Sequence, residues 1–491
     1  MLIARRPPLP PWRRRPPLHQ AARAPLELEK EYPVTVPHRP GKLHLNAFLM
    51  TIGHHESAWR YPESNLTGTW DVAHYQHLAR VAERAKFDSI FFGDGPALQG
   101  DIRYRPVGRL DPTALLPALA VVTERIGLVA TASTTYNEPY NLARRFATID
   151  HISGGRAGWN IVTTAGSDAA QNFGLDEVPE HRHRYERAAE FVDVCLQLWD
   201  SWEDDFLIGD REKGRFADGD KIHRIDHEGR FFRVRGPLNV PRTPQGHPLL
   251  VQAGSSEDGR EFAAQYAEAV FTAQQTLAEG QAFYADLKRR IAAFGRKPGL
   301  VKILPGIVPV LGGTEEEARR RESELAELQV PAYGLKQLSG LIGAELTEAD
   351  LDRPLPPVGD VTAVRGMQSR FALVTDLARR ENLTVRQLLS RLGGGRGHRT
   401  FTGTPEQVAE TIEEWFTQGA ADGFNVMPPL LPSGLEAFAE HVVPILQRRG
   451  LFRTEYEGTT LRDHYGLPRP ENRFAARRAA GGQVAAAAPA R

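Results

Sequence analysis

The chain has 491 residues, of which 61 are Lys or Arg and 61 are Asp or Glu, so its formal net charge is zero. A zero net charge argues against a general nucleic-acid binder, because such proteins usually carry a basic excess. Hydrophobic residues make up 41% and charged residues 25% of the chain, an ordinary globular mixture that excludes wholesale disorder. The single cysteine, Cys195, excludes a disulfide framework and a cysteine-based metal cluster within one chain.

The two ends of the chain differ in composition from the middle. Residues 1–25 contain no acid and are rich in arginine and proline, and the prolines leave no apolar core for an export signal. We therefore predict a disordered basic arm over 1–40, a globular domain over 41–470 and a flexible tail over 471–491. No run approaches the roughly 18 apolar residues of a membrane-spanning helix, so no membrane partner is expected.

Short apolar runs and helical patterns alternate through the middle of the chain. The runs are nearly continuous, as in strands that are buried on both faces of a parallel sheet. The predicted strands are 43–49, 87–94, 126–133, 157–164, 248–254, 269–273, 301–311 and 423–427. The predicted helices are 70–86, 112–123, 140–150, 182–199, 259–266, 277–294, 314–328, 405–418 and 435–449. Eight such alternations predict an α/β protein with a (β/α)8 TIM barrel.

The longest connection, 330–402, lies between the seventh and eighth strands. We predict that it packs over the barrel mouth as helices or is partly mobile. In this fold the chemistry takes place at the carboxyl ends of the strands, so the polar residues there are the candidates. They are His54 and His55 after the first strand, Asp94 after the second, Thr131, Tyr136 and Asn137 on or after the third, Asn160 on the fourth, and Ser255 and Ser256 after the fifth.

Two segments indicate a phosphate site. The fifth strand ends in Ser255 and Ser256 and is followed by a helix, whose first N–H groups and dipole favour an anion. The alternative is that one of these serines only caps the helix. His181 and Tyr185 are four residues apart at the start of another helix. They share a face and can both donate to an anion, although a solvated first turn explains them equally well.

Each of the remaining polar candidates has a more specific interpretation. Asn160 carries an amide that can recognise a ligand carbonyl or ring N–H. His54 and His55 are adjacent, so their side chains point in opposite directions, unlike the ligands of a metal-dependent hydrolase barrel. One of them is either a structural hydrogen-bonding group or part of a substrate or oxygen pocket. We predict no metal site.

Several motifs carry a family resemblance. Residues 142–163 closely resemble the bacterial-luciferase-like, flavin-dependent monooxygenases, in the branch of nitrilotriacetate monooxygenase component A and dibenzothiophene-sulfone monooxygenase. The other motifs agree in order along the chain; they are 91–94, 130–136, 181–185, 201–205, 252–256, 452–462 and 466–470.

The resemblance implies a two-component oxygenase that acts on a small organic substrate. Reduced FMN would come from a separate NAD(P)H:flavin reductase and would react with O2 to give a C4a-(hydro)peroxyflavin. By similarity, the isoalloxazine ring would contact Asp94, Thr131 and Asn160. The phosphate would contact His181, Tyr185, Ser255 and Ser256. The family also implies a cytoplasmic homodimer or homotetramer.

The acid or base of the reaction is less defined. His55 is the first candidate for hydrogen bonding to the peroxide or the substrate. Some family members carry a histidine after the third strand, whereas this chain has Tyr136 and Asn137 there as the remaining candidates. The alternatives to an oxygenase are an oxidoreductase that uses the deazaflavin F420 on the same barrel, a non-catalytic luciferase-like subunit and a metal-dependent hydrolase.

Overall fold

The structure is a computed structural model and describes residues 41–98, 101–164, 166–358, 368–395 and 397–480. Within these ranges the barrel strands are β1 (His44–Leu49), β2 (Ser89–Phe92), β3 (Gly127–Ser133), β4 (Ala157–Val162), β9 (Leu249–Ala253), β10 (Ala269–Thr272), β11 (Lys302–Leu311) and β13 (Gly423–Val426). All of them are parallel, and each pairs with the next in this order. The pairing of β13 with β1 closes the barrel. The predicted (β/α)8 TIM barrel is confirmed.

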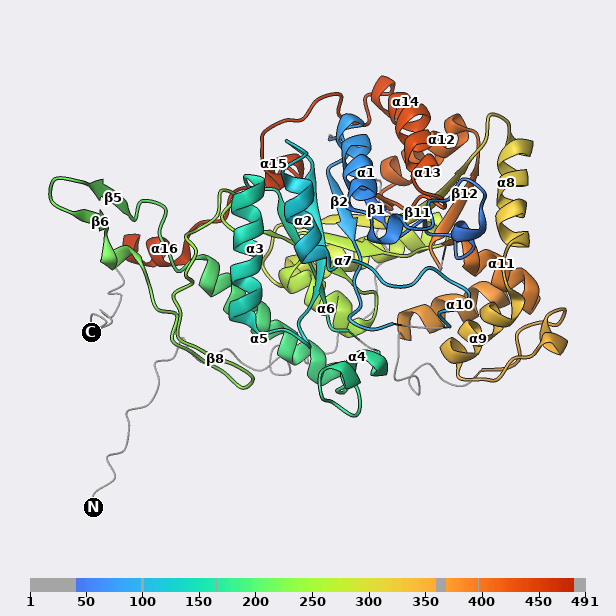
Figure 1. Cartoon of the computed structure of the whole chain (residues 1–491), viewed down its shortest axis with the longest axis horizontal. Helices are drawn as coiled ribbons and strands as arrows, with labels where there is room; N and C mark the ends of the chain where they lie inside the picture. Colours follow the sequence, from blue (N-terminus) through green and yellow to red (C-terminus); the bar gives the residue numbers. More distant parts are fainter. Residues whose placement is uncertain (1–40, 99–100, 165, 359–367, 396, 481–491) are drawn as a thin grey trace, which may run out of the picture. The chain divides into compact units, whose positions relative to one another are not determined.

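Helices follow the strands and form the outer layer of the barrel. They are α1 (Val72–Arg84), α2 (Pro112–Ala120), α3 (Pro139–Ser153), α5 (His181–Trp199), α6 (Glu257–Tyr266), α7 (Leu277–Ala293) and α12 (Pro405–Thr417). Figure 1 shows α1, α2 and α3 side by side outside the strands. The helix starts carry local signals: Asp71 and Asp111 accept backbone N–H groups of α1 and α2, and Thr276 and Thr404 form capping boxes at α7 and α12.

The last predicted helix is not regular. Residues 433–448 form α13 (Ser433–Ala437), a π-helical turn, η8 (Phe438–Val442), and α14 (Val443–Arg448). Pro444 lies just after the π-turn and has no backbone N–H. It removes one helical hydrogen bond, and a local change in helix winding accommodates that loss.

The amino-terminal end of the barrel is closed by the segment near the C-terminus. Helix α15 (Leu461–His464) places Leu461 and Tyr465 among the inward-facing apolar residues of the strands. Gly127 and Gly158 make room for Leu461, since a Cβ on either glycine would come too close to a Leu461 methyl. The opposite end, where β3, β4 and β9 end in polar residues, is therefore the open mouth.

The connection between β11 and β13 is the largest insertion, as predicted. It contains α8 (Glu315–Glu327), α9 (Pro331–Ile342), the short helix η6 (Glu348–Asp350), α10 (Gln368–Arg380), α11 (Val385–Gly395) and β12 (Arg399–Gly403). Helices α9, α10 and α11 share a small apolar core of their own and gather on one side of the barrel (Figure 1). Strand β12 was not predicted. It pairs in parallel with the second half of β11, from Ile307 to Leu311, and such a non-local pairing leaves no pattern in a short polar segment.

The long connections after β4 hold only small elements. They are α4 (Ser167–Asn172), the hairpin of β5 (Leu207–Asp210) and β6 (Arg215–Ala217), and the hairpin of β7 (His227–Glu228) and β8 (Arg233–Val234). Short single-turn helices fill other loops: η2 (Ala58–Arg60), η3 (Gly68–Trp70), η4 (Gly219–Lys221) and η5 (Pro298–Leu300).

The flexible tail predicted from residue 471 is wrong for its first part. Helix α16 (Arg473–Ala479) follows Asn472, whose side-chain amide donates to the carbonyl oxygens of Asp200 and Trp202. Arg473 also pairs with the buried Asp200 carboxylate at 3.0 Å. These contacts join residues far apart in the sequence, so composition alone did not reveal them. The predicted arm, 1–40, and residues 481–491 lie outside the described residues.

Asp200 makes the anchoring of α16 sensitive to acid. Burial alone would raise the pKa of Asp200, but a 2.7 Å hydrogen bond from His247 and the charges of Arg473 and Arg242 lower it to about 2. Burial lowers the pKa of His247, so its neutral ring donates Nε2–H at pH 7.

Because the pKa of Asp200 is lower in the folded state, its stabilisation is complete above about pH 4 and is lost as the pH falls toward about 2. We expect the wild type to lose about 2 kcal/mol more free energy of unfolding over that interval than Asp200→Asn. Urea unfolding at a series of pH values measures this difference. Parallel losses in the two proteins would contradict it.

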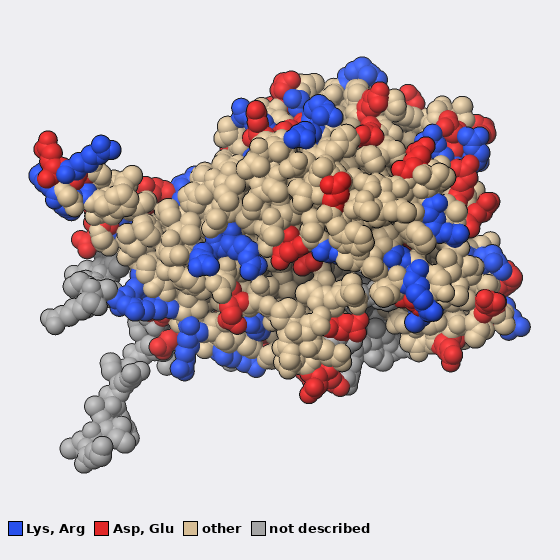
Figure 2. All heavy atoms as spheres, in the orientation of Figure 1, with Lys and Arg blue, Asp and Glu red and all other residues tan. Residues whose placement is uncertain are grey.

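The positive and negative side chains that give the zero net charge are also mixed over the surface. On the face shown in Figure 2, basic and acidic side chains alternate without a large area of one sign. In the part of the chain that the structure describes, no helix is both long and apolar enough to cross a bilayer. Across the same residues, no group of three or more His, Cys, Asp or Glu side chains could hold a metal ion.

Candidate functional site: the barrel mouth

The predicted phosphate residues come together between α5 and α6. The Tyr185 hydroxyl lies beside the side chains of Ser256 and Thr163, so it joins the start of α6 to the end of β4. The His181 ring lies 4.9 Å from the Tyr185 ring, centroid to centroid. Its Nδ1 is 2.8 Å from a carboxylate oxygen of Asp258 in the first turn of α6. We call His181, Tyr185 and Ser256, with the start of α6, the cradle.

For the serine pair, capping of α6 and a place beside the proposed phosphate site are compatible. Ser256 is the N-cap of α6, and its Oγ accepts the N–H of Gly259 at 3.2 Å. Ser255 points toward the next strand, where its Oγ lies 3.1 Å from Thr272 Oγ1. Ser256 therefore faces the cradle hydroxyl and Ser255 does not. The binding role predicted for Ser255 remains a prediction.

Two glycines allow the backbone to come close to the Tyr185 hydroxyl in the cradle. A Cβ on Gly254 would lie 3.3 Å from Tyr185 Oη and 2.5 Å from Gln252 Nε2. A Cβ on Gly259 would lie 3.2 Å from the same hydroxyl and 3.1 Å from Ser256 Oγ. The absence of side chains at both positions leaves backbone next to two hydroxyls at a helix start, which is the arrangement that favours a phosphate.

Sequence reasoning missed Arg184. This side chain is only 3% exposed, and its Nη1 donates to the carbonyl oxygens of Thr163 and Thr164 at 2.9 Å each. It fixes the backbone at the end of β4, beside the cradle. An arginine in the first turn of a helix usually reaches solvent, so no sequence pattern singled out Arg184.

Thr131 and Asn160 form a second polar pair on the inner face of the barrel. They are register partners on β3 and β4, and Asn160 Nδ2 donates to Thr131 Oγ1 at 2.8 Å. Both residues are 3% exposed. Asn160 Oδ1 is buried and has no hydrogen-bond partner among the residues that the structure describes. A buried acceptor without a partner is costly, and a ligand N–H would satisfy it.

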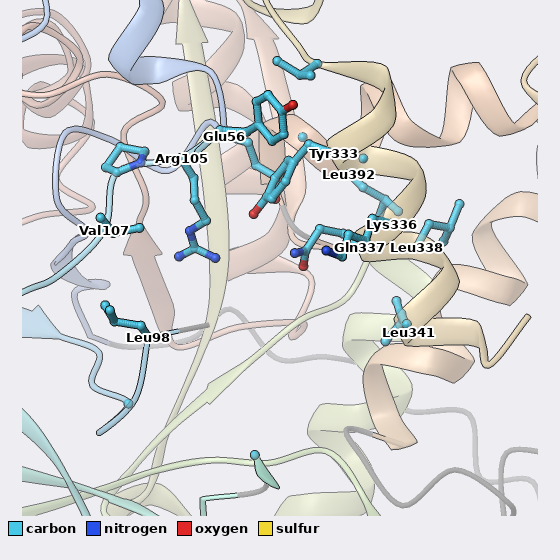
Figure 3. Close-up of a pocket in the computed structure, with 18 of the residues that line it drawn as sticks. Glu56, Leu98, Arg105, Val107, Tyr333, Lys336, Gln337, Leu338, Leu341 and Leu392 are labelled. Carbon is cyan, nitrogen blue, oxygen red and sulfur yellow. The ribbon is translucent and has the colours of Figure 1, made fainter. Parts of the chain in front are cut away.

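Asp94 lies on the wall of a cavity of about 1500 Å³ at the barrel mouth. The cavity extends from the loops after β1 and β2 to α9 and α11, and it reaches the end of β4 at Val162 and Thr164 (Figure 3). Burial raises the pKa of Asp94, while the N–H of Gly95 and the charge of Arg109 lower it.

The two adjacent histidines have different surroundings. His54 is fully buried; its Nε2 donates to the carbonyl oxygen of Phe48 at 2.8 Å, and its ring packs against the Phe48 ring. His55 accepts the backbone N–H of Ser57 on Nδ1 at 3.1 Å. The neutral His55 ring therefore carries its proton on Nε2, and the ring edge approaches Gly394 of α11. His54 is thus the structural member of the pair.

Tyr136 and Asn137 do not line the cavity. The Tyr136 ring stacks on Phe173 at 4.6 Å, and its buried hydroxyl has no hydrogen-bond partner among the described residues. Asn137 Nδ2 donates to the carbonyl oxygen of Ser133 at 2.9 Å, which fixes its own turn. His55 does not line the cavity either, and the catalytic roles of all three residues remain predictions.

His398 is a second residue that sequence reasoning missed. It precedes β12, is 8% exposed, and stacks on Phe271 inside the barrel at 5.0 Å. A Cβ on Gly306 would collide with its ring. The insertion thereby brings an imidazole to the barrel mouth. Its position depends on the unpredicted pairing of β12 with β11, so no local pattern revealed it.

The residues present fit a flavin phosphate at the mouth. The cradle supplies hydroxyls, a ring donor and a helix start for a phosphate, and the unpartnered Asn160 Oδ1 suits a ring N–H.

Comparison with known proteins agrees with this geometry. The family model described as "Luciferase-like monooxygenase" matches residues 48–422. The chain is 50% identical to nitrilotriacetate monooxygenase component A of Aminobacter aminovorans over 447 residues, 88% of this chain and 98% of that protein. It is 41% identical to dibenzothiophene-sulfone monooxygenase of Rhodococcus erythropolis (strain XP) over 446 residues, with the same shares.

A solved structure shows the same fold. EDTA monooxygenase from Chelativorans sp. BNC1 matches with a TM-score of 0.75 and 36% identity, over 87% of this chain and 99% of that one. The predicted resemblance, including its branch, is confirmed. The chain belongs to the luciferase-like monooxygenase family and is a flavin-dependent monooxygenase.

Proposed function

We propose that this protein is the oxygenase component of a two-component system that uses reduced FMN and O2 to oxygenate a small organic substrate. A separate NAD(P)H:flavin reductase supplies the reduced FMN, which places the reaction in the cytoplasm with the NAD(P)H pool. The active form is a homodimer or homotetramer.

One observation carries the proposal. The cradle and the unpartnered Asn160 Oδ1 belong to the adjacent strands β4 and β9 and to the helices that follow them. Together they suit a ligand with a phosphate at one end and a ring N–H at the other. Membership of the flavin-dependent, luciferase-like monooxygenase family supports a flavin such as FMN as that ligand.

The residues of this chain bind and orient the flavin and shield the site from water. Bound reduced FMN supplies two electrons, so that one atom of O2 enters the substrate, the other leaves as water, and FMN is released oxidised. The cradle fixes the phosphate, and the Thr131–Asn160 pair sets the position of the ring. Helices α9 and α11 cover one side of the cavity and reduce the access of water.

The test uses isotopically labelled oxygen to follow the proposed oxygenation reaction. The purified protein is mixed with a flavin reductase, NADH, FMN and ¹⁸O2, and candidate products are analysed by mass spectrometry. The proposal expects one ¹⁸O atom in the product and none in the absence of FMN. Product oxygen that comes only from water would overturn it.

His55 is expected to affect the yield of this reaction more than its rate. Its neutral ring donates from Nε2, and loss of one such hydrogen bond in a buried site weakens the productive complex by about tenfold. We therefore expect His55→Ala to release most of the oxygen as hydrogen peroxide, whereas His55→Gln retains a donor and part of the yield. The ratio of product to FMN oxidised measures this. An unchanged ratio in His55→Ala would remove His55 from the site.

A further inference from the structure

The cavity at the barrel mouth has an apolar wall and a polar wall. In Figure 3 the side chains of α9 and α11 that line it include Leu338, Leu341 and Leu392, and Leu98 and Val107 lie on the loop after β2. Arg105 extends from that loop into the cavity and faces Lys336 and Gln337 of α9. A molecule with an apolar body and a polar end would match both walls.

Arg105 has no hydrogen bond or ion pair with any described residue, although it is half-buried. A second guanidinium, Arg109, lines the same loop and donates to the carbonyl oxygen of Gly93 at 3.2 Å. Burial lowers the pKa of Arg109, the charge of Asp94 raises it, and the charge of Arg105 lowers it further. An anion placed between the two arginines and the cavity would relieve their repulsion.

The other charged side chains of the cavity already have a hydrogen-bond partner or an opposite charge beside them. Asp111 caps α2 by accepting the N–H and hydroxyl of Thr113 at 2.7 Å each. Asp94 lies beside Arg109, and Glu56 has an interaction of its own. Lys336 pairs loosely with Asp101 at 3.8 Å. Among the charged side chains of the cavity that the structure describes, Arg105 is the one without an opposite charge or hydrogen-bond acceptor.

We propose that the substrate of this oxygenase carries a carboxylate, attached to an apolar body, and that Arg105 binds this carboxylate. The inference rests on the proposed function, because it concerns the same mouth. A guanidinium matches a carboxylate with two parallel hydrogen bonds and is weakly hydrated, so it suits a half-buried position. The apolar residues of α9 and α11 then hold the body of the substrate.

The experiment compares two probes of the same size, (phenylthio)acetate and its uncharged amide, (phenylthio)acetamide. Their binding to the full chain, with FMN present, is measured by isothermal titration calorimetry. The variants are Arg105→Met, which keeps length and loses charge, and Arg105→Lys, which keeps charge. Arg103→Met is the matched control, because Arg103 lies two residues away in the same loop and pairs with Asp101 outside the cavity lining.

The wild type is expected to bind the carboxylate about tenfold or more tightly than the amide. Arg105→Met should remove this preference and leave amide binding unchanged, Arg105→Lys should retain part of it, and Arg103→Met should behave as the wild type. Equal binding of the two probes, no binding of either, or an equal loss of both in Arg105→Met would overturn the inference. Binding of reduced FMN is measured on the same samples. Its absence would overturn the proposed function, while its presence with no carboxylate preference would overturn only this inference.

Discussion

Replacing Tyr185 with phenylalanine and Ser256 with alanine in one protein is expected to weaken the binding of FMN about 100-fold. Each hydroxyl removed is a donor to the proposed phosphate, and a hydrogen bond to a charged group contributes about 1.5–3 kcal/mol. The loss should concern the phosphate alone. Riboflavin, which has no phosphate, should bind the variant as it binds the wild type, so the preference for FMN over riboflavin disappears. Fluorescence titration under anaerobic conditions, with reduced and oxidised flavin, measures both.

A control is needed because Ser256 also caps α6. Loss of an N-cap costs about 1 kcal/mol of stability wherever the helix lies. Thr314→Ala removes the same kind of cap from α8, where Thr314 Oγ1 accepts the N–H of Glu317 at 3.2 Å. This control should lose similar stability and retain its FMN affinity. If the double variant still preferred FMN to riboflavin, the cradle would not be the phosphate site.

Replacing Asp88 with asparagine is expected to lower the free energy of unfolding by about 3–5 kcal/mol, since it leaves a buried cation without its counter-charge. Asp88 is fully buried at the start of β2. It accepts hydrogen bonds from the backbone N–H of Leu45 at 2.8 Å and from His44 at 2.9 Å, and it forms an ion pair with Arg453. Burial would raise the pKa of Asp88, but Arg453 and His44 hold it below its ordinary value.

Asp88 matters beyond its own contacts because Arg453 joins the C-terminal segment to the barrel floor. Arg453 also donates to the carbonyl oxygen of His464 in α15 at 2.8 Å. Asp205→Asn is the matched control, since Asp205 pairs with Lys221 at the surface and exposed pairs contribute little. Urea unfolding compares the three proteins. An Asp88→Asn midpoint equal to that of Asp205→Asn would mean that the floor does not depend on this ion pair.

The barrel was predictable because its strands are buried on both faces. Such strands need continuous apolar runs, and the runs at 126–133 and 301–311 match β3 and β11 to within a residue at either end. Helix starts were predictable for a similar local reason, since Asp111 or Thr404 satisfies N–H groups within its own first turn. Information of this kind lies within a few residues of sequence.

The parts that were missed depend on contacts between distant segments. Strand β12 exists because it pairs with β11, about ninety residues earlier in the chain, and it is this pairing that brings His398 over Phe271. Helix α16 is held by Asp200 in the same way. Propensity and periodicity describe a segment alone, so they cannot report such a partner.

In the candidate site, too, local sequence patterns revealed some residues and missed others. His181 and Tyr185 could be paired from their spacing on one helix, and Asn160 from its place on a strand that ends at the mouth. Arg184 could not be found in this way, since only the folded chain shows that it binds the carbonyl oxygens of Thr163 and Thr164. The catalytic assignment of His55, Tyr136 and Asn137 stays a prediction.

The most direct test of the oxygenase assignment is rapid mixing of the protein and reduced FMN with oxygenated buffer, while the absorbance of oxidised flavin is followed. The account predicts that the protein binds reduced FMN and delays the appearance of oxidised flavin relative to free reduced FMN, and that the cradle double variant loses the delay. Oxidation at the rate of the free flavin, with no binding of reduced FMN, would contradict it. That result would favour an F420-dependent oxidoreductase or a non-catalytic subunit instead.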